Sequence, residues 1–197
     1  MAKKRVGGKA ARRGDTHKLI PGLRALENSI RRNKTETAYV YGADGKLLFS
    51  QDGTEKEVHF TSEQGSAMEG GILTHNHPGK MGNGFSRQDV NLLISRNLLE
   101  MRAVHRDGIH SLKRMREVGE LDRLSFASLY LYYYENYVEA ERSLADSLQR
   151  DFDKGKISRN KINQEYHTIN MRIQENMKDW LRNNAEKHGY RYTVERG

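Results

Sequence analysis

The spacing of apolar residues changes once along the chain, near Leu121, and this change limits the folds that the chain can adopt. Before that point, short apolar runs alternate with polar residues and are separated by glycine-containing turns, as in strands joined by hairpins. After it, apolar residues recur at intervals of three and four, as in amphipathic helices. The sequence therefore predicts an α+β fold, with a mixed sheet and flanking helices in residues 23–120 and an antiparallel helical hairpin in residues 121–197.

Four segments of the first part show strand patterns. In "TETAYVYGADGKLLFS", two alternating runs flank Asp44-Gly45, which predicts a β-hairpin. "RAVHRDGIHSLKR" predicts a second hairpin, which turns at Asp107-Gly108. "KEVHF" and "GGILTH" are predicted to be single short strands, and a short helix is predicted over residues 23–32.

The second part predicts two packed helices and a short last strand. Helical spacing runs through residues 124–152, Ser158 can cap a second helix, and "GYRYTVERG" is predicted to be a strand. A tyrosine-rich segment, "YLYYYENY", lies in the first helix, and some of its tyrosines form a stripe along one side of that helix. We expect this stripe to pack in the core or against a partner rather than to stack on nucleic-acid bases. The hairpin could then join two copies in a homo-oligomer. The stripe passes through Tyr130, Tyr134 and Tyr137, and leaves Tyr132 and Tyr133 exposed.

The positive charge of the chain is concentrated at its beginning. Residues 1–34 hold 11 Lys/Arg and 2 Asp/Glu, whereas the rest of the chain holds 23 and 24. Residues 1–22 combine this charge with glycine and proline, and they are predicted to form a basic disordered arm. Residues 1–34 could contact nucleic acid or another polyanion, and the alternative is a solvated tail without a partner.

The absence of cysteine narrows the chemistry available to the chain. It excludes disulfides, thiolate catalysis and zinc–sulfur sites, so any metal must be held by His, Asp or Glu. No run approaches 18 consecutive apolar residues, and we expect no membrane contact. The expected location is the cytoplasm of a bacterial or phage-infected cell, or a virion.

The stretch "GGILTHNHPGKMGNGFSRQDV" predicts a metal site. At the end of a strand, His75 and His77 point to the same face, while Asn76 points to the other. Ser86 is a good N-cap for the following helix, and Asp89 lies on the first turn of that helix. Two histidines and a carboxylate, with one position open to water, are the ligands of catalytic zinc sites. We therefore expect zinc on His75, His77 and Asp89.

A hydrolytic zinc site also needs a general base beside the bound water, usually a carboxylate. Glu36, at the start of the "TETAYVYG" strand, is the candidate. Spacing alone does not distinguish it from three other acidic residues, Glu57, Glu63 and Glu69.

"THNHPGKMGNGFSRQD" resembles the JAMM (JAB/MPN) metalloprotease motif, which is His-x-His, a spacer and Ser-x-x-Asp. The Thr-His-Asn-His-Pro string is most similar to the RadC-like branch, although the spacer before Ser86 is one residue longer than usual. The resemblance covers roughly residues 33–116. It implies a JAMM/MPN-like curved mixed sheet, zinc on the three predicted ligands, Glu36 as the catalytic base, and Ser86 as a stabiliser of the oxyanion. Similar domains with a helical extension accompany phage head-morphogenesis proteins.

These features predict a zinc-dependent hydrolase that acts on a peptide or isopeptide bond in a protein or peptide substrate. The alternative is a non-catalytic metal-binding module that acts as a phage structural or anti-defence protein. An HNH nuclease is disfavoured, because its histidines would be spread over a ββα element. The remaining histidines are not expected to be ligands: His59, His105 and His110 are predicted to be half-exposed on strands, and His17, His167 and His188 to face solvent.

Overall fold

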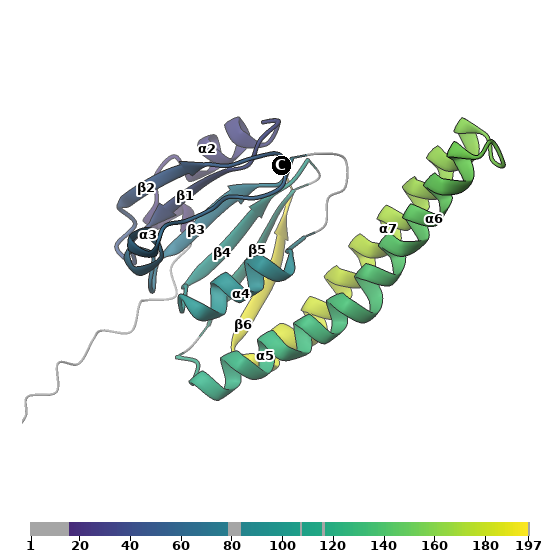
Figure 1. Ribbon diagram of the computed structural model, residues 1–197. Coiled ribbons are helices and arrows are strands. Elements are labelled where there is room, and N and C mark those ends of the chain that lie inside the picture. The colour runs from purple at the N-terminus through teal and green to yellow at the C-terminus, as the bar shows by residue number, and fades with distance from the viewer. Residues whose placement is uncertain (1–15, 79–83, 107, 116, 197) are drawn as a thin grey trace, which may run out of the picture.

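A six-stranded mixed sheet forms the centre of the protein (Figure 1). The computed structural model describes residues 16–78, 84–106, 108–115 and 117–196. The strand order is β2-β1-β3-β4-β5-β6, and neighbouring strands are antiparallel except for β3 and β4. The strands are β1 (Thr37–Tyr41), β2 (Leu47–Asp52), β3 (Ile72–Asn76), β4 (Glu100–Val104), β5 (Ile109–Arg114) and β6 (Tyr190–Glu195). The predicted α+β class and mixed sheet are confirmed.

Helices cover both faces of the sheet. One face carries α1 (Thr16–Leu19) and α2 (Leu23–Ile30). The other carries α4 (Arg87–Ser95), α5 (Glu120–Tyr133) and part of α7 (Arg159–Asn184), which share one large apolar core with the sheet. The remaining elements are α3 (Ser62–Ala67), a π-helical segment η1 (Tyr134–Val138), α6 (Glu139–Asp153) and a 3₁₀ turn η2 (Ala185–His188).

The C-terminal part forms the predicted hairpin and then returns to the sheet. Helices α6 and α7 lie side by side and extend away from the sheet (Figure 1). After them, β6 pairs with β5, as in the register Leu112↔Tyr192. Phe126 and Tyr190 are buried in the same cluster as Leu73 of β3. The predicted boundary at residue 120 therefore does not separate two cores.

The described fold begins inside the predicted arm. Thr16–Leu19 are helical, and Thr16 and Ile20 are buried. Ile20 packs against Leu23 and Ile72, so apolar contact orders a segment that was predicted to be disordered. Residues 1–15 of the predicted arm lie outside the described residues, as do Asp107 and residues 79–83.

The tyrosine stripe differs from its prediction in a specific way. Tyr130 and Tyr134 are buried as expected, but Tyr133 is buried at 5% exposure and Tyr137 is 56% exposed. The exposure of Tyr137 results from the π-helical segment η1, whereas Tyr133 lies before η1, at the end of α5, and is buried on the same side of that helix as Tyr130, three residues earlier. A π turn closes with an i→i+5 hydrogen bond, so it adds a residue and rotates the following side chains around the axis. Tyr132 is exposed as predicted.

One predicted strand is not formed. Residues 56–60 form no strand. The helix after Ser86 ends at Ser95, because Asn97 adopts a left-handed conformation (φ 49°) and the chain then enters β4. In the part of the chain that the structure describes, we find no helix of sufficient length and apolarity to span a membrane.

Candidate metal and active site

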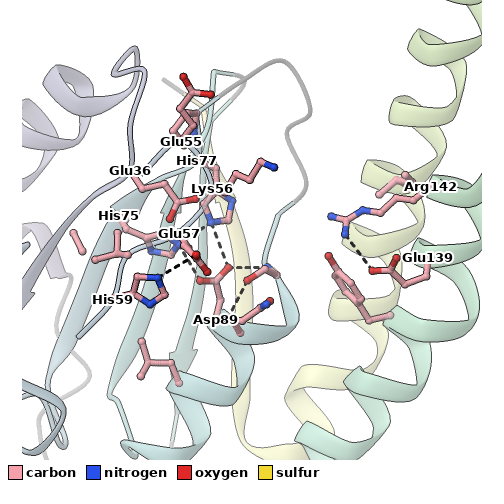
Figure 2. A pocket seen from close by; sticks show the side chains of 18 of the residues that line it. Glu36, Glu55, Lys56, Glu57, His59, His75, His77, Asp89, Glu139 and Arg142 are labelled. Atoms are coloured by element: carbon pink, nitrogen blue, oxygen red, sulfur yellow. Dashed lines mark hydrogen bonds and ion pairs between the residues drawn. The ribbon is translucent and has the colours of Figure 1, made fainter. Parts of the chain in front are cut away.

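The three predicted metal ligands meet at the end of β3 (Figure 2). His75 Nε2 lies 3.0 Å from Asp89 Oδ1, and His77 Nε2 lies 3.3 Å from Asp89 Oδ2. The two Nε2 atoms are 2.8 Å apart. Ligands about 2.0–2.1 Å from a tetrahedral ion are separated by roughly 3.3 Å, so these atoms need only small shifts to share one ion. The His-His-Asp group can therefore hold a metal ion.

The pleat of β3 and the cap of α4 produce this convergence. His75 and His77 lie two residues apart, and both point to the face that α4 covers. Ser86 Oγ accepts a hydrogen bond from the Asp89 backbone N–H (3.1 Å), and the Ser86 backbone N–H donates to Asp89 Oδ2 (2.7 Å). This capping box fixes the Asp89 carboxylate beside the histidines. The structural role expected for Ser86 is therefore confirmed.

Electrostatics also favour an ionised Asp89. Burial on its own would raise the pKa of this carboxyl, but His75 and His77 outweigh it and hold the pKa well below its usual range. A carboxylate that remains charged while it is enclosed beside two imidazoles is a suitable metal ligand.

Strand register brings Glu36 to the same place. In the antiparallel β1–β3 pair, Ala38 is opposite His75, so the register continued by two residues puts Glu36 opposite His77. Residues opposite one another lie on the same face of a sheet. Glu36 lines the same cleft as the two histidines and is 9% exposed.

Asn76 fixes the backbone on either side of Glu36. Its Oδ1 accepts a hydrogen bond from the Thr37 N–H (2.7 Å), and its Nδ2 donates to the Thr35 carbonyl (3.0 Å). Asn76 is fully buried and points away from the histidines, as predicted from the strand pleat. The middle residue of the His-Asn-His triplet therefore holds the segment that carries the candidate base.

The pKa of Glu36 is raised into the range that suits a general base at neutral pH. Burial raises its pKa from 4.5 to about 7; His77 opposes this shift, and Asp89 and Glu57 add to it. A base is most effective when its pKa lies near the working pH. Of the three alternatives, Glu57 lines the cleft, whereas Glu63 and Glu69 are exposed elsewhere.

Two buried histidines were missed by the sequence analysis. His105 and His110 were predicted to be half-exposed, but each is only 1% exposed. The His105 ring meets the His77 ring edge-on at 4.8 Å, and the His110 ring meets His105 at 4.9 Å. His105 Nε2 donates a hydrogen bond to the Gly84 carbonyl, and His110 Nδ1 lies 2.7 Å from the Tyr192 hydroxyl. The alternating strand pattern suggested that these two histidines face solvent, but helices pack on that face of the sheet and bury them.

The other predicted histidine positions agree with the structure in part. His59 was predicted to be half-exposed on a strand, but it is exposed in a loop and lies 3.1 Å from a Glu57 carboxylate oxygen. His167 is exposed. His17 is partly buried and lies 2.8 Å from Glu195, and His188 is partly buried against Phe126.

A cleft of about 900 Å³ opens over the metal ligands. One wall is the 55–60 loop, and the opposite wall is the helical hairpin, from which Glu139 and Arg142 face the ligands across the gap (Figure 2). Ser86 also lines the cleft, and no described residue accepts a hydrogen bond from its hydroxyl. The arrangement combines a metal-ligand group, a carboxyl of raised pKa and a hydroxyl donor in one open space.

The chain matches no protein-family model, and searches of the curated proteins and of the solved structures gave no significant match.

Proposed function

We propose that the protein is a zinc-dependent hydrolase of the JAMM (JAB/MPN) type that cleaves a peptide or isopeptide bond. The observation that carries the proposal is the register between β1 and β3, which brings the Glu36 carboxyl into the cleft beside His75 and His77. The order of the motif residues and the mixed sheet with flanking helices agree with this family, and the phage setting follows from the same resemblance.

In this proposal, His75, His77 and Asp89 hold the ion. When bound there, zinc would lower the pKa of a coordinated water and polarise the carbonyl oxygen of the substrate. Glu36 accepts the proton of the attacking water and returns it to the leaving amine, a role that its raised pKa suits. The Ser86 hydroxyl donates a hydrogen bond to the developing oxyanion.

Two variants test the proposal together. We expect one zinc ion per chain in the wild-type protein and in Glu36→Gln, and loss of zinc in His77→Ala, measured by elemental analysis after gel filtration. Turnover should be lost in both variants, because the first lacks the base and the second lacks the metal. Zinc retained at full occupancy in His77→Ala would overturn the ligand assignment.

The alternative, a metal-binding module without catalysis, makes a different prediction. In that case Glu36→Gln and the wild-type protein would behave alike in every assay of activity, including a phage-propagation assay. A fall in turnover of about 100-fold or more with zinc retained identifies Glu36 as the base.

A further inference from the structure

The cleft over the metal ligands is acidic, although the chain as a whole carries a net charge of +8. Its lining contains two Lys/Arg residues, Lys56 and Arg142, and three histidines, of which His59 lies 3.1 Å from a Glu57 carboxylate oxygen. Against these it contains six acidic residues, Glu36, Glu55, Glu57, Asp89, Glu139 and Asp146. A divalent ion at the metal site would offset Glu36 and Asp89, and the walls would still hold twice as many acids as Lys/Arg residues.

The negative charge lies on both walls. Glu55 and Glu57 belong to the loop beside Glu36, and Asp146 is an exposed residue of α6. On the same wall, Arg142 lies 3.1 Å from a Glu139 carboxylate oxygen and stacks 5.3 Å from the Tyr134 ring centroid. Much of the positive charge of Arg142 is therefore compensated within the wall.

The floor of the cleft contains an acid that has no hydrogen-bond partner among the described residues. Glu36 is 9% exposed and lines the cleft, yet no described residue donates a hydrogen bond to its carboxyl group. A buried polar group is normally hydrogen-bonded. The unpaired Glu36 therefore indicates that a ligand group or water completes its environment.

We propose that the substrate is a cationic peptide segment, with lysine or arginine side chains within a few residues of the scissile bond. The inference rests on the proposed function of the site. Acidic walls of a cleft attract cations and disfavour anionic competitors, because like charges brought close together repel. On this proposal, Glu55 and Glu57 contact basic side chains on one side of the scissile bond, and Asp146 contacts them on the other.

Binding can be measured without turnover in zinc-loaded Glu36→Gln protein. The probes are three fluorescent peptides of equal length, rich in lysine, glutamine or glutamate, measured by anisotropy at low and high salt. We expect the lysine peptide to bind about tenfold more tightly than the glutamine peptide at low salt, and this preference to fall at high salt. Equal affinity for these two peptides would overturn the inference.

A pair of charge-matched variants locates the binding. Glu57→Gln/Asp146→Asn removes two charges from the cleft, and Glu69→Gln/Glu135→Gln removes two from exposed positions outside it. We expect the first pair to weaken binding of the lysine peptide about three- to tenfold and the second to leave it unchanged. An equal loss of affinity in both double variants would show that the peptide responds to the net charge of the protein and not to the cleft, and it would overturn the inference.

Digestion of a mixed library of linear and lysine-branched peptides, which contain both peptide and isopeptide bonds, by the zinc-loaded wild-type protein separates the two proposals. Cleavage with basic residues enriched near the cut supports both. Cleavage without that enrichment overturns the cationic specificity alone. Cleft-dependent binding of the lysine peptide, with no cleavage of any peptide, overturns the proposed hydrolase alone.

Discussion

Asn76 Oδ1 accepts a 2.7 Å hydrogen bond from the backbone N–H of Thr37, and this bond links the ligand-bearing strand β3 to the segment that carries Glu36. The second bond, from Asn76 Nδ2 to the Thr35 carbonyl, fixes the other side of Glu36. The candidate ligands His75 and His77 lie on β3, whereas the candidate base Glu36 lies directly before β1, so their relative position depends on this buried amide.

Asn76→Ala should therefore affect both stability and catalysis. It leaves a buried N–H and a carbonyl without partners, which should lower the free energy of unfolding by about 2–3 kcal/mol, measured by urea denaturation. Turnover should fall more than zinc affinity, because His75 and His77 keep their places on β3. Asn163→Ala, at an exposed position on α7, is the control and should change neither quantity. Loss of zinc equal to the loss of turnover would contradict this role.

The raised pKa of Glu36 predicts how the stability of the metal-free protein depends on pH. The folded state holds the proton up to about pH 7, whereas the unfolded chain releases it near 4.5. The contribution of Glu36 to the free energy of unfolding is therefore fully favourable below about pH 4.5, and it is lost as the pH rises towards 7. Glu36→Gln removes this pH-dependent loss of stability. Relative to the wild type, its free energy of unfolding should therefore rise by about 1–2 kcal/mol between about pH 4.5 and 7, allowing for solvent screening.

Chemical denaturation in the presence of a chelator, at several pH values between 4 and 8, measures this difference. The exposed acid Glu135, changed to Gln, is the control, and its difference from the wild type should not depend on pH. A constant difference for Glu36→Gln would show that the Glu36 carboxyl is not desolvated in the fold.

The sequence predicted most of this site because the signals are local. The His-x-His spacing places two imidazoles on one face of a strand, and the capping pattern of Ser86 and Asp89 starts a helix. The position of Glu36 was not a local property. It depends on the β1–β3 register, which no spacing within either strand determines.

The errors in the fold have similar causes. The exposure of Tyr137 results from one π turn, which a strict 3.6-residue period cannot predict. The burial of His105 and His110 results from helices that return from residues 120–184 to cover the sheet. Neither the π turn nor the covering of the sheet by later helices can be predicted from the spacing of apolar residues alone.

His105 should act as a positioning residue for the metal site. Its Nε2–H holds the Gly84 carbonyl, two residues before the Ser86 cap that fixes Asp89, and its ring supports the His77 ring at 4.8 Å. His105→Phe keeps a ring but loses the hydrogen bond, and we expect zinc affinity to fall about tenfold in a competition assay with a chromophoric chelator.

His105→Gln retains a donor that can reach the Gly84 carbonyl, and it should recover part of the lost affinity. His167→Phe, on the exposed face of α7, is the control for adding a phenyl ring and should bind zinc like the wild type. If His105→Phe is folded by circular dichroism and binds zinc normally, the positioning role is wrong.

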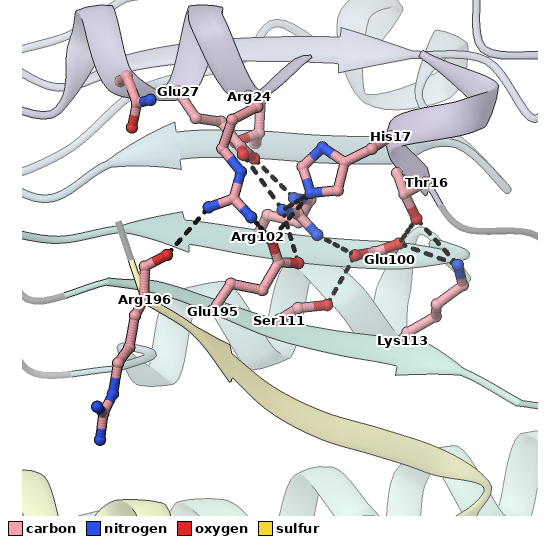
Figure 3. A network of polar contacts seen from close by, with 12 residues as sticks. Thr16, His17, Arg24, Glu27, Glu100, Arg102, Ser111, Lys113, Glu195 and Arg196 are labelled. Atoms are coloured by element: carbon pink, nitrogen blue, oxygen red, sulfur yellow. Dashed lines mark hydrogen bonds and ion pairs between the residues drawn. The ribbon is translucent and has the colours of Figure 1, made fainter. Parts of the chain in front are cut away.

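Arg102 should be the most important single charge for stability. It lies 1% exposed on the face that α1 and α2 cover, and it binds Glu27 (2.6 Å), Glu100 (2.7 Å) and Glu195 (3.0 Å) (Figure 3). These partners come from α2, β4 and β6, so one guanidinium joins the beginning, middle and end of the described chain. Arg102→Met leaves buried carboxylates unpaired and should cost about 3–5 kcal/mol at pH 7.

The loss of stability caused by Arg102→Met should become smaller as the pH falls. In the wild type, burial alone would raise the pKa of Glu100, but Arg102 and hydrogen bonds from Thr16 and Ser111 outweigh burial and lower it. Without Arg102, burial favours the protonated carboxyl, so the variant gains stability relative to the wild type below about pH 5. Arg172→Met breaks an exposed pair with Glu141 and should cost less than about 1 kcal/mol at every pH. Equal costs for the two variants in urea denaturation would show that the Arg102 network does not hold the three segments together.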